Sequence, residues 1–174
     1  MRIGNGTLIS LRAGSEEPGK LYNRIMLLRI LRLALTIPLL MTLPATAESP
    51  QVTVFKLRTC SCCAKWIEHL RANGFEVTVQ EVDSTADYEA KYGVPASLRS
   101  CHTAIVDGYT IEGHVPAQDI QRLLKERPAA KGLAVPGMPI GSPGMEVGTR
   151  VQAYSVMLFD AEGNTSTYQS YPSR

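Results

Sequence analysis

The chain has 174 residues, of which 18 are Lys or Arg and 16 are Asp or Glu, giving a formal net charge of +2. The positive excess lies in residues 1–47, which hold six basic and two acidic residues; residues 48–174 hold 12 and 14, a net charge near −2. This balance gives no indication of the basic patch that nucleic-acid binding requires, so we expect no nucleic-acid partner.

Residues 26–47 have the three-part layout of a secretory signal peptide. Two arginines come first, an apolar run covers residues 33–43, and Ala45-Thr46-Ala47 closes the segment with small side chains. The apolar run is shorter than the roughly 20 residues that a membrane span needs. We therefore predict cleavage after Ala47, a periplasmic location and no membrane attachment after cleavage; a retained anchor is the alternative. Met26 is either the true start or part of an extended leader.

The chain thus divides into an N-terminal extension with signal peptide, 1–47, and one domain, 48–174, long enough for a hydrophobic core. Apolar and β-branched residues alternate in four segments that we predict to be strands, namely 52–57, 75–82, 103–106 and 109–112. Asp107-Gly108 predicts the turn between the last two.

Three helices are predicted between these strands. Cys63, Trp66, Ile67 and Leu70 have the spacing of one helix face, and Asn73-Gly74 ends that helix. Asp83-Ser84 is expected to cap a short helix that runs through Lys91. Pro116 suits the first position of a third helix, which ends before Pro128.

The C-terminal part has a different composition. Residues 131–148 are rich in Gly and Pro and are predicted to be a loop, whereas 151–159 and 165–171 alternate and predict a hairpin packed on the main sheet. The element order β-α-β-α-β-β-α, with a parallel first pair, predicts an α/β, thioredoxin-like fold. It would have a mixed central sheet, flanking helices and a C-terminal β-hairpin.

Three of the four cysteines stand together in TCSCC, residues 59–63. Cys60 and Cys63 have the Cys-x-x-Cys redox spacing at the start of a helix, where the N-terminus favours a thiolate. Cys60 and Cys62 make a Cys-x-Cys pair typical of metal binding. Export implies an oxidising compartment, but a structural disulfide framework fits poorly, because pairing Cys60 with Cys63 leaves Cys62 over.

Cys101 precedes the third predicted strand, where it would face the cysteine motif and complete a four-thiolate site. The alternative is a buried free cysteine. His102 is expected to point to the opposite face in a regular strand, as a structural hydrogen-bond partner or a metal contact. His114 is a weaker candidate, for a supporting role or as an additional metal ligand. His69 lies two helical turns from Cys62 and is expected on a solvated face.

Met138 and Met145 lie in the segment VPGMPIGSPGME, which has neither helical nor strand periodicity. Thioethers and thiolates together select Cu(I), so both are further candidate ligands; the alternative is that they fill gaps under a long loop. Met157 alternates within a predicted strand and is expected in the core.

Over residues 52–150 the chain resembles the CopG-type periplasmic copper-resistance proteins, a small family with a thioredoxin-like fold. The matching segments are TCSCC with Trp66, Gly93-Val94-Pro95, Ser100-Cys101-His102-Thr103, Glu112-Gly113-His114-Val115-Pro116, and the Gly-Met-Pro and Gly-Ser-Pro-Gly-Met stretches. The resemblance implies copper binding by Cys60, Cys62, Cys63 and Cys101 as a multinuclear Cu(I)–thiolate cluster. Storage of copper, its transfer and its cycling between Cu(I) and Cu(II) are alternatives that the resemblance leaves open.

Three functions follow from these observations. The first is a periplasmic copper-binding protein of copper tolerance that exchanges copper ions with other periplasmic copper-handling proteins and is not a conventional enzyme. The second is a thiol–disulfide oxidoreductase that uses Cys60 and Cys63. The third is a structural zinc module, in which the methionines would have no role.

Overall fold

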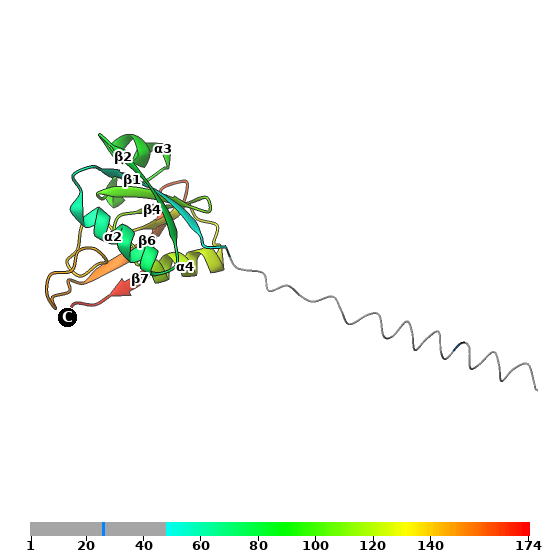
Figure 1. Cartoon of the computed structure of the whole chain (residues 1–174). Coiled ribbons are helices and arrows are strands. Elements are labelled where there is room, and N and C mark those ends of the chain that lie inside the picture. Colours follow the sequence, from blue (N-terminus) through cyan, green and yellow to red (C-terminus); the bar gives the residue numbers. More distant parts are fainter. Residues whose placement is uncertain (1–25, 27–47) are drawn as a thin grey trace, which may run out of the picture. The chain divides into compact units, whose positions relative to one another are not determined.

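The computed structural model describes Met26 and residues 48–174. The predicted signal peptide and its cleavage site after Ala47 therefore lie, apart from Met26, outside the described residues. Residues 48–174 form one seven-stranded sheet with helices packed on it (Figure 1). The strands are β1 (Gln51–Leu57), β2 (Glu76–Val82), β3 (His102–Val106), β4 (Tyr109–Glu112), β5 (Gly132–Ala134), β6 (Tyr154–Phe159) and β7 (Thr165–Tyr171).

The helices are α2 (Ser61–Ala72), α3 (Ala86–Lys91), α4 (Ala117–Glu126) and a short 3₁₀ turn, Ala96–Leu98. The strand order across the sheet is β2-β1-β3-β4-β5-β6-β7. β1 pairs with β2 in parallel through the α2 crossover, and with β3 in antiparallel register, Val52 opposite Val106. The predicted α/β class with a mixed sheet is confirmed; the thioredoxin-like assignment stays a prediction.

The prediction that residues 131–148 form a loop is wrong at its start. Gly132–Ala134 form β5, parallel to β4 and antiparallel to β6. A Cβ at Gly132 would lie 1.7 Å from the carbonyl oxygen of Thr110, so only glycine allows the two strands to pair here. Three residues are too few for an alternating pattern. Through β5 the C-terminal hairpin β6–β7 becomes part of the same sheet.

Smaller differences concern the ends of elements. The short helix begins at Ala86 and its N-cap residue is Thr85, not Asp83 or Ser84. The hydroxyl of Ser84 still accepts a hydrogen bond from the amide of Ala86, at 3.2 Å. β6 begins at Tyr154, three residues later than predicted, and Met157 is only partly buried.

The main core lies between one face of the sheet and two helices. Trp66, Ile67 and Leu70 of α2 and Ile120 and Leu123 of α4 are at most 2% exposed and pack against strand residues in one cluster. α3 covers the other face, where Tyr88 and Tyr92 stack on Phe55 of β1 at ring-centroid distances of 4.2 and 5.6 Å. The helix face predicted from the periodicity of α2 is the face that is buried.

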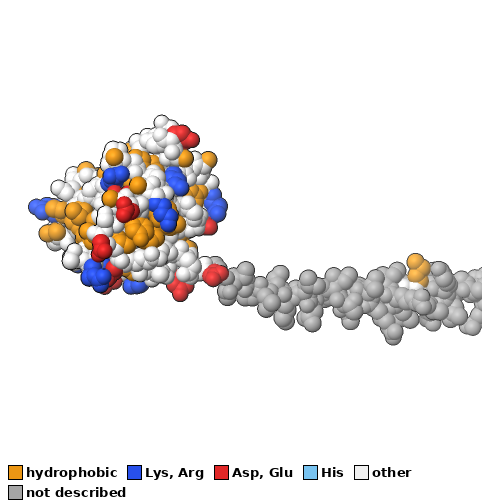
Figure 2. All heavy atoms as spheres, turned by 90° about the horizontal axis from the view of Figure 1, so that it is seen from above, with side chains coloured by type: hydrophobic (Ala, Val, Ile, Leu, Met, Phe, Trp, Pro, Cys, Tyr) orange, Lys and Arg blue, Asp and Glu red, His pale blue; other side chains and the backbone are white. Residues whose placement is uncertain are grey.

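Basic and acidic side chains are interspersed over the face shown in Figure 2, with apolar side chains between them. Three large apolar side chains of residues 48–174 are markedly exposed: Leu57, Met138 and Val147. Within the described part of the chain, no helix combines the length and the apolar character that crossing a membrane would require.

Candidate metal centre

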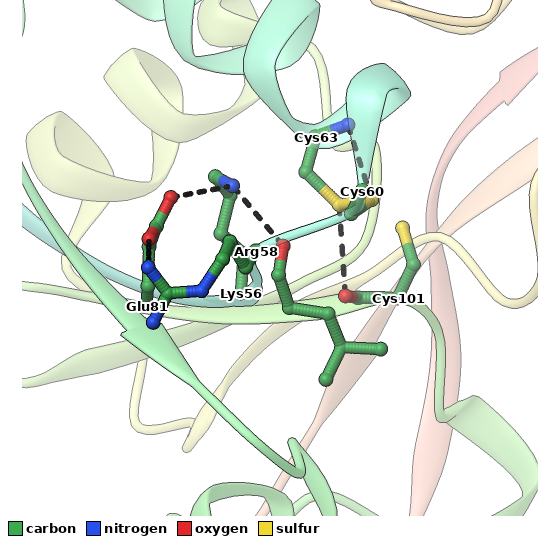
Figure 3. Close-up of polar contacts among 7 residues, drawn as sticks. Lys56, Arg58, Cys60, Cys63, Glu81 and Cys101 are labelled. Carbon is green, nitrogen blue, oxygen red and sulfur yellow. Dashed lines mark hydrogen bonds and ion pairs between the residues drawn. A yellow bond between two sulfur atoms is a disulfide. The ribbon is translucent and has the colours of Figure 1, made fainter.

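The first turn of α2 places the cysteine motif. Cys60 is the N-cap residue, with extended backbone angles, and its Sγ accepts a hydrogen bond from the amide of Cys63 at 3.3 Å. A sulfur thus takes the capping role that oxygen usually takes, at a helix end that favours negative charge. Cys60 and Cys63 form a disulfide (Figure 3). The Sγ of Cys62 lies 3.4 Å from that of Cys60.

Sheet pairing brings Cys101 to this motif. β1 and β3 are antiparallel neighbours with Lys56 opposite His102, so the end of β1 and the start of β3 lie at the same end of the sheet. Cys101 therefore meets the start of α2 although 38 residues separate it from Cys63. The carbonyl oxygen of Cys101 lies 3.6 Å from the Sγ of Cys63 (Figure 3). The four sulfur atoms of Cys60, Cys62, Cys63 and Cys101 all lie within 4.8 Å of one another.

Two histidines join Cys101 in a second, overlapping group. The Sγ of Cys101 lies 3.1 Å from Nε2 of His114 and 3.3 Å from Nδ1 of His102. Nδ1 of His114 lies 2.8 Å from the carbonyl oxygen of Pro143. Because a carbonyl can only accept, this Nδ1 carries the proton, and the lone pair of Nε2 faces the sulfur. A neutral imidazole held in this way is a suitable metal ligand.

The expectation that His102 points away from Cys101 is wrong. Cys101 precedes the strand, so the strict alternation of strand side chains does not apply to this pair. His102 is fully buried, packs against Trp66 with the two rings tilted by 41° at a centroid distance of 4.3 Å, and contacts Cys101 through Nδ1. Among the described residues its Nε2 has no hydrogen-bond partner. The adjacency of a cysteine and a histidine was the one sequence signal for this contact.

Burial controls the protonation of the second group. It lowers the pKa of His102 to about 3, with the neighbouring His114 adding to the effect, and it lowers the pKa of His114. Both rings are therefore neutral at pH 7. Burial, with the charge of Cys62, raises the pKa of Cys101 well above its usual range, so a metal ion must displace the thiol proton in order to bind.

The remaining candidates lie at different places. His69 is half-buried and belongs to neither ligand group; its Nε2 accepts a hydrogen bond from the amide of Ala117, the first residue of α4. It is therefore a structural partner of α4 rather than a purely solvated side chain. Met138 is 53% exposed, and Met145 closes a tight turn through backbone hydrogen bonds to Gly141 and Ser142.

The segment that carries Met145 lies directly on the first turns of α2. A Cβ at Gly144 would come within 2.8 Å of the carbonyl oxygen of Cys62 and of the amide nitrogen of Trp66. The neighbouring Pro143 supplies the carbonyl that orients His114. Sequence reasoning missed Pro143, because a backbone carbonyl leaves no trace in the pattern of side chains.

On the other side of the motif, charged side chains pair with one another (Figure 3). Lys56 is 7% exposed; its Nζ donates to the carbonyl of Leu57 at 3.1 Å and lies 3.7 Å from the carboxylate of Glu81. Arg58 reaches the same carboxylate at 3.0 Å. Lys56 and Arg58, which precede the motif, are therefore both paired with Glu81 of β2.

Comparison with solved structures identifies the family. Two structures described as copper resistance protein CopG, form 1 and form 2, are each 46% identical to the chain with a TM-score of 0.69. The alignments cover 72% of this chain and 99 to 100% of theirs. The chain belongs to the CopG family of copper resistance proteins.

Two further comparisons were with protein-family models and with curated proteins. A family model described as "Protein of unknown function, DUF411" matches residues 98–145. That segment of this CopG family member holds Cys101, both histidines of the second group and two candidate methionines, whereas the motif at residues 60–63 lies before it. A search of curated proteins found no match.

Proposed function

We propose that the protein binds Cu(I) for copper tolerance, with Cys60, Cys62, Cys63 and Cys101 as thiolate ligands. The observation that carries this proposal is the meeting of four sulfur atoms within 4.8 Å at a helix N-terminus. Thiolates are the ligands that Cu(I) prefers, and membership of a family of copper resistance proteins supports copper over other soft metals.

The two ligand groups share Cys101. A thiolate can bridge two metal ions, so overlapping groups suit a multinuclear copper–thiolate cluster better than a single mononuclear ion. In this proposal His114 is an additional ligand through Nε2, and Met138 and Met145 are further candidates from the segment that covers α2. An N/S ligand set of this kind supports cycling between Cu(I) and Cu(II).

The disulfide state of the motif sets a condition on metal binding. While Cys60 and Cys63 are joined, neither can bind copper as a thiolate. Reduction of this bond takes two electrons and two protons and yields two thiols, which then lose their protons to bind copper. The copper-binding form of the proposal is therefore the reduced protein.

The predicted leader supports a periplasmic site of action, with copper ions as cargo and other periplasmic copper-handling proteins as donors or acceptors. Cleavage after Ala47 would give a mature chain that starts at Glu48. The intact mass of the exported protein tests this. A product that retains residues 33–43 in the membrane fraction would contradict the assignment.

The main test compares copper with zinc on protein reduced and purified without oxygen. With both metals supplied equally, the protein should retain copper, measured by elemental analysis. Cys101→Ser should lose much of its bound Cu(I), while the Cys60–Cys63 pair can still be oxidised, as measured by thiol trapping. His69→Gln, which keeps an acceptor for the amide of Ala117 and lies outside both groups, is the matched control and should retain copper. Displacement of copper by zinc, or unchanged copper in Cys101→Ser, would count against the proposal.

The Cys60–Cys63 disulfide favours a second candidate, a thiol–disulfide oxidoreductase. That activity needs a nucleophilic thiol and a resolving partner at a helix N-terminus, and Cys101 would be a bystander to it. Rapid reduction of insulin disulfides by the metal-free protein, unaffected by Cys101→Ser, would favour this second function over copper binding.

A further inference from the structure

A buried carboxylate lies beneath the turn that carries Cys101. Glu112, the last residue of β4, is fully buried, and each of its oxygens accepts one hydrogen bond. The backbone amide of Ser100 donates to Oε1 at 2.7 Å, and the hydroxyl of Thr103 donates to Oε2 at 2.7 Å. We call these three residues the Glu112 brace.

The brace compensates for missing sheet pairing. Thr103 pairs with Glu112 across β3 and β4, but Ser100 precedes β3 and has no strand partner for its amide. The carboxylate supplies the acceptor that the sheet cannot. Since Cys101 is the next residue, the hydrogen bond to Ser100 fixes the backbone that positions the Cys101 sulfur.

A second set of contacts fixes the same turn from the other side. The hydroxyl of Ser100 donates to the carbonyl of Gly137 at 2.6 Å, which ties the turn to the segment that carries Met138. Gly113, with φ of +68°, lies so close that a Cβ there would come within 2.6 Å of the Ser100 hydroxyl and of the carbonyl oxygen of Val135. Ser100 is therefore held both through its amide and through its side chain.

Within residues 48–174, the Glu112 carboxylate is held by hydrogen bonds and not by an ion pair. Burying a charged or polar group is costly unless it makes compensating interactions, and the Ser100 amide and the Thr103 hydroxyl supply them here. Arg99, which directly precedes Ser100, pairs with Glu89 at 3.2 Å. Within residues 48–174, the hydrogen-bond partners of the Glu112 carboxylate are the two residues of its brace.

We infer that Glu112 is a positioning residue for copper binding: through the amide of Ser100 it places the Cys101 thiolate within reach of the other three sulfur atoms. The inference rests on the proposed function. It does not depend on the charge of Glu112, because a protonated carboxyl group retains an oxygen that accepts from the amide of Ser100.

The test measures the apparent affinity for Cu(I) of the full reduced protein, by competition with a chromogenic Cu(I) chelator. Glu112→Ala should weaken binding about tenfold, as expected for loss of one hydrogen bond that holds the turn of Cys101. Glu112→Gln should bind nearly as wild type, because its amide oxygen can still accept from Ser100. Thr110→Val is the matched control, since it removes a buried hydroxyl of the same strand whose partner is the carbonyl of Tyr92.

A double-mutant cycle with Cys101→Ser separates positioning from general destabilisation. If Glu112 acts through Cys101, then Glu112→Ala should change the affinity little in the Cys101→Ser background. Wild-type affinity in Glu112→Ala, an equal loss in both backgrounds, or a loss in Glu112→Gln as large as in Glu112→Ala would overturn the inference. Wild-type affinity in Cys101→Ser alone would instead remove the four-thiolate function itself, whatever Glu112 does.

One measurement on the wild type keeps the inference testable if Glu112→Ala does not fold. The amide of Ser100 lies outside the strands, yet the brace predicts that it exchanges slowly with deuterium. The control is the Ser100 amide in the Thr110→Val variant, which should exchange equally slowly. Rapid exchange of the Ser100 amide in the folded wild type would show that the carboxylate does not hold the turn.

Discussion

Gly144 provides a direct test of how the C-terminal segment closes over the cysteine motif. It has φ of +86°, and a Cβ there would lie 2.8 Å from both the carbonyl oxygen of Cys62 and the amide nitrogen of Trp66. Both are backbone atoms of α2 and cannot rotate away. Gly144→Ala should therefore be destabilised for two reasons. Alanine disfavours the positive φ, and its Cβ would collide with the backbone of α2.

Gly148 is the matched control, because it also has a positive φ, +59°, but nothing lies within 4 Å of an added Cβ. Gly148→Ala should lower the free energy of unfolding by about 1 kcal/mol, the cost of a left-handed conformation for a residue with a Cβ. Gly144→Ala should add roughly 1–3 kcal/mol for the forced displacement of packed atoms. Against a total stability of about 5–15 kcal/mol, this difference is readily measured.

The assay is reversible urea unfolding with the Cys60–Cys63 disulfide kept intact in all samples. Gly144→Ala should also bind copper more weakly than Gly148→Ala, because the displaced segment includes Pro143, whose carbonyl orients His114. Equal losses of stability in the two variants would mean that the segment does not pack against α2 as described, and the argument for the covered site would fail.

Two further outcomes are expected. Burial raises the pKa of Asp119 despite the hydrogen bond from Tyr171. The folded state therefore binds the proton more tightly than the unfolded state does. The free energy of unfolding should fall as the pH rises from the usual aspartate pKa through the raised one. Asp119→Asn should flatten that part of the profile, and an unchanged slope would contradict it. Trp66, the one tryptophan of the chain, packs against the ring of His102 at a centroid distance of 4.3 Å, so copper binding should quench its fluorescence. Stoichiometric copper uptake with unchanged emission would place the copper elsewhere.

Local patterns in the sequence were sufficient for most of the elements and for the nature of the site. The spacing of Cys63, Trp66, Ile67 and Leu70 identified the buried face of α2, because helix periodicity is a local property. Crowding of three thiols at the start of that helix predicted a soft metal or redox site for the same reason. Placing Cys101 beside them relied on a fold hypothesis, and the pairing of β1 with β3 brings it there.

Only the tertiary structure decided which contacts hold Cys101 and His114 in place beside the cysteine motif at residues 60–63. β5 escaped prediction because three residues carry no periodicity, and its pairing depends on the absence of a side chain at Gly132. The orientation of His114 depends on a backbone carbonyl of Pro143, and the turn at Cys101 depends on a carboxylate twelve residues from Ser100. Contacts between backbone groups and distant side chains follow from packing, which the order of residues along the chain does not display.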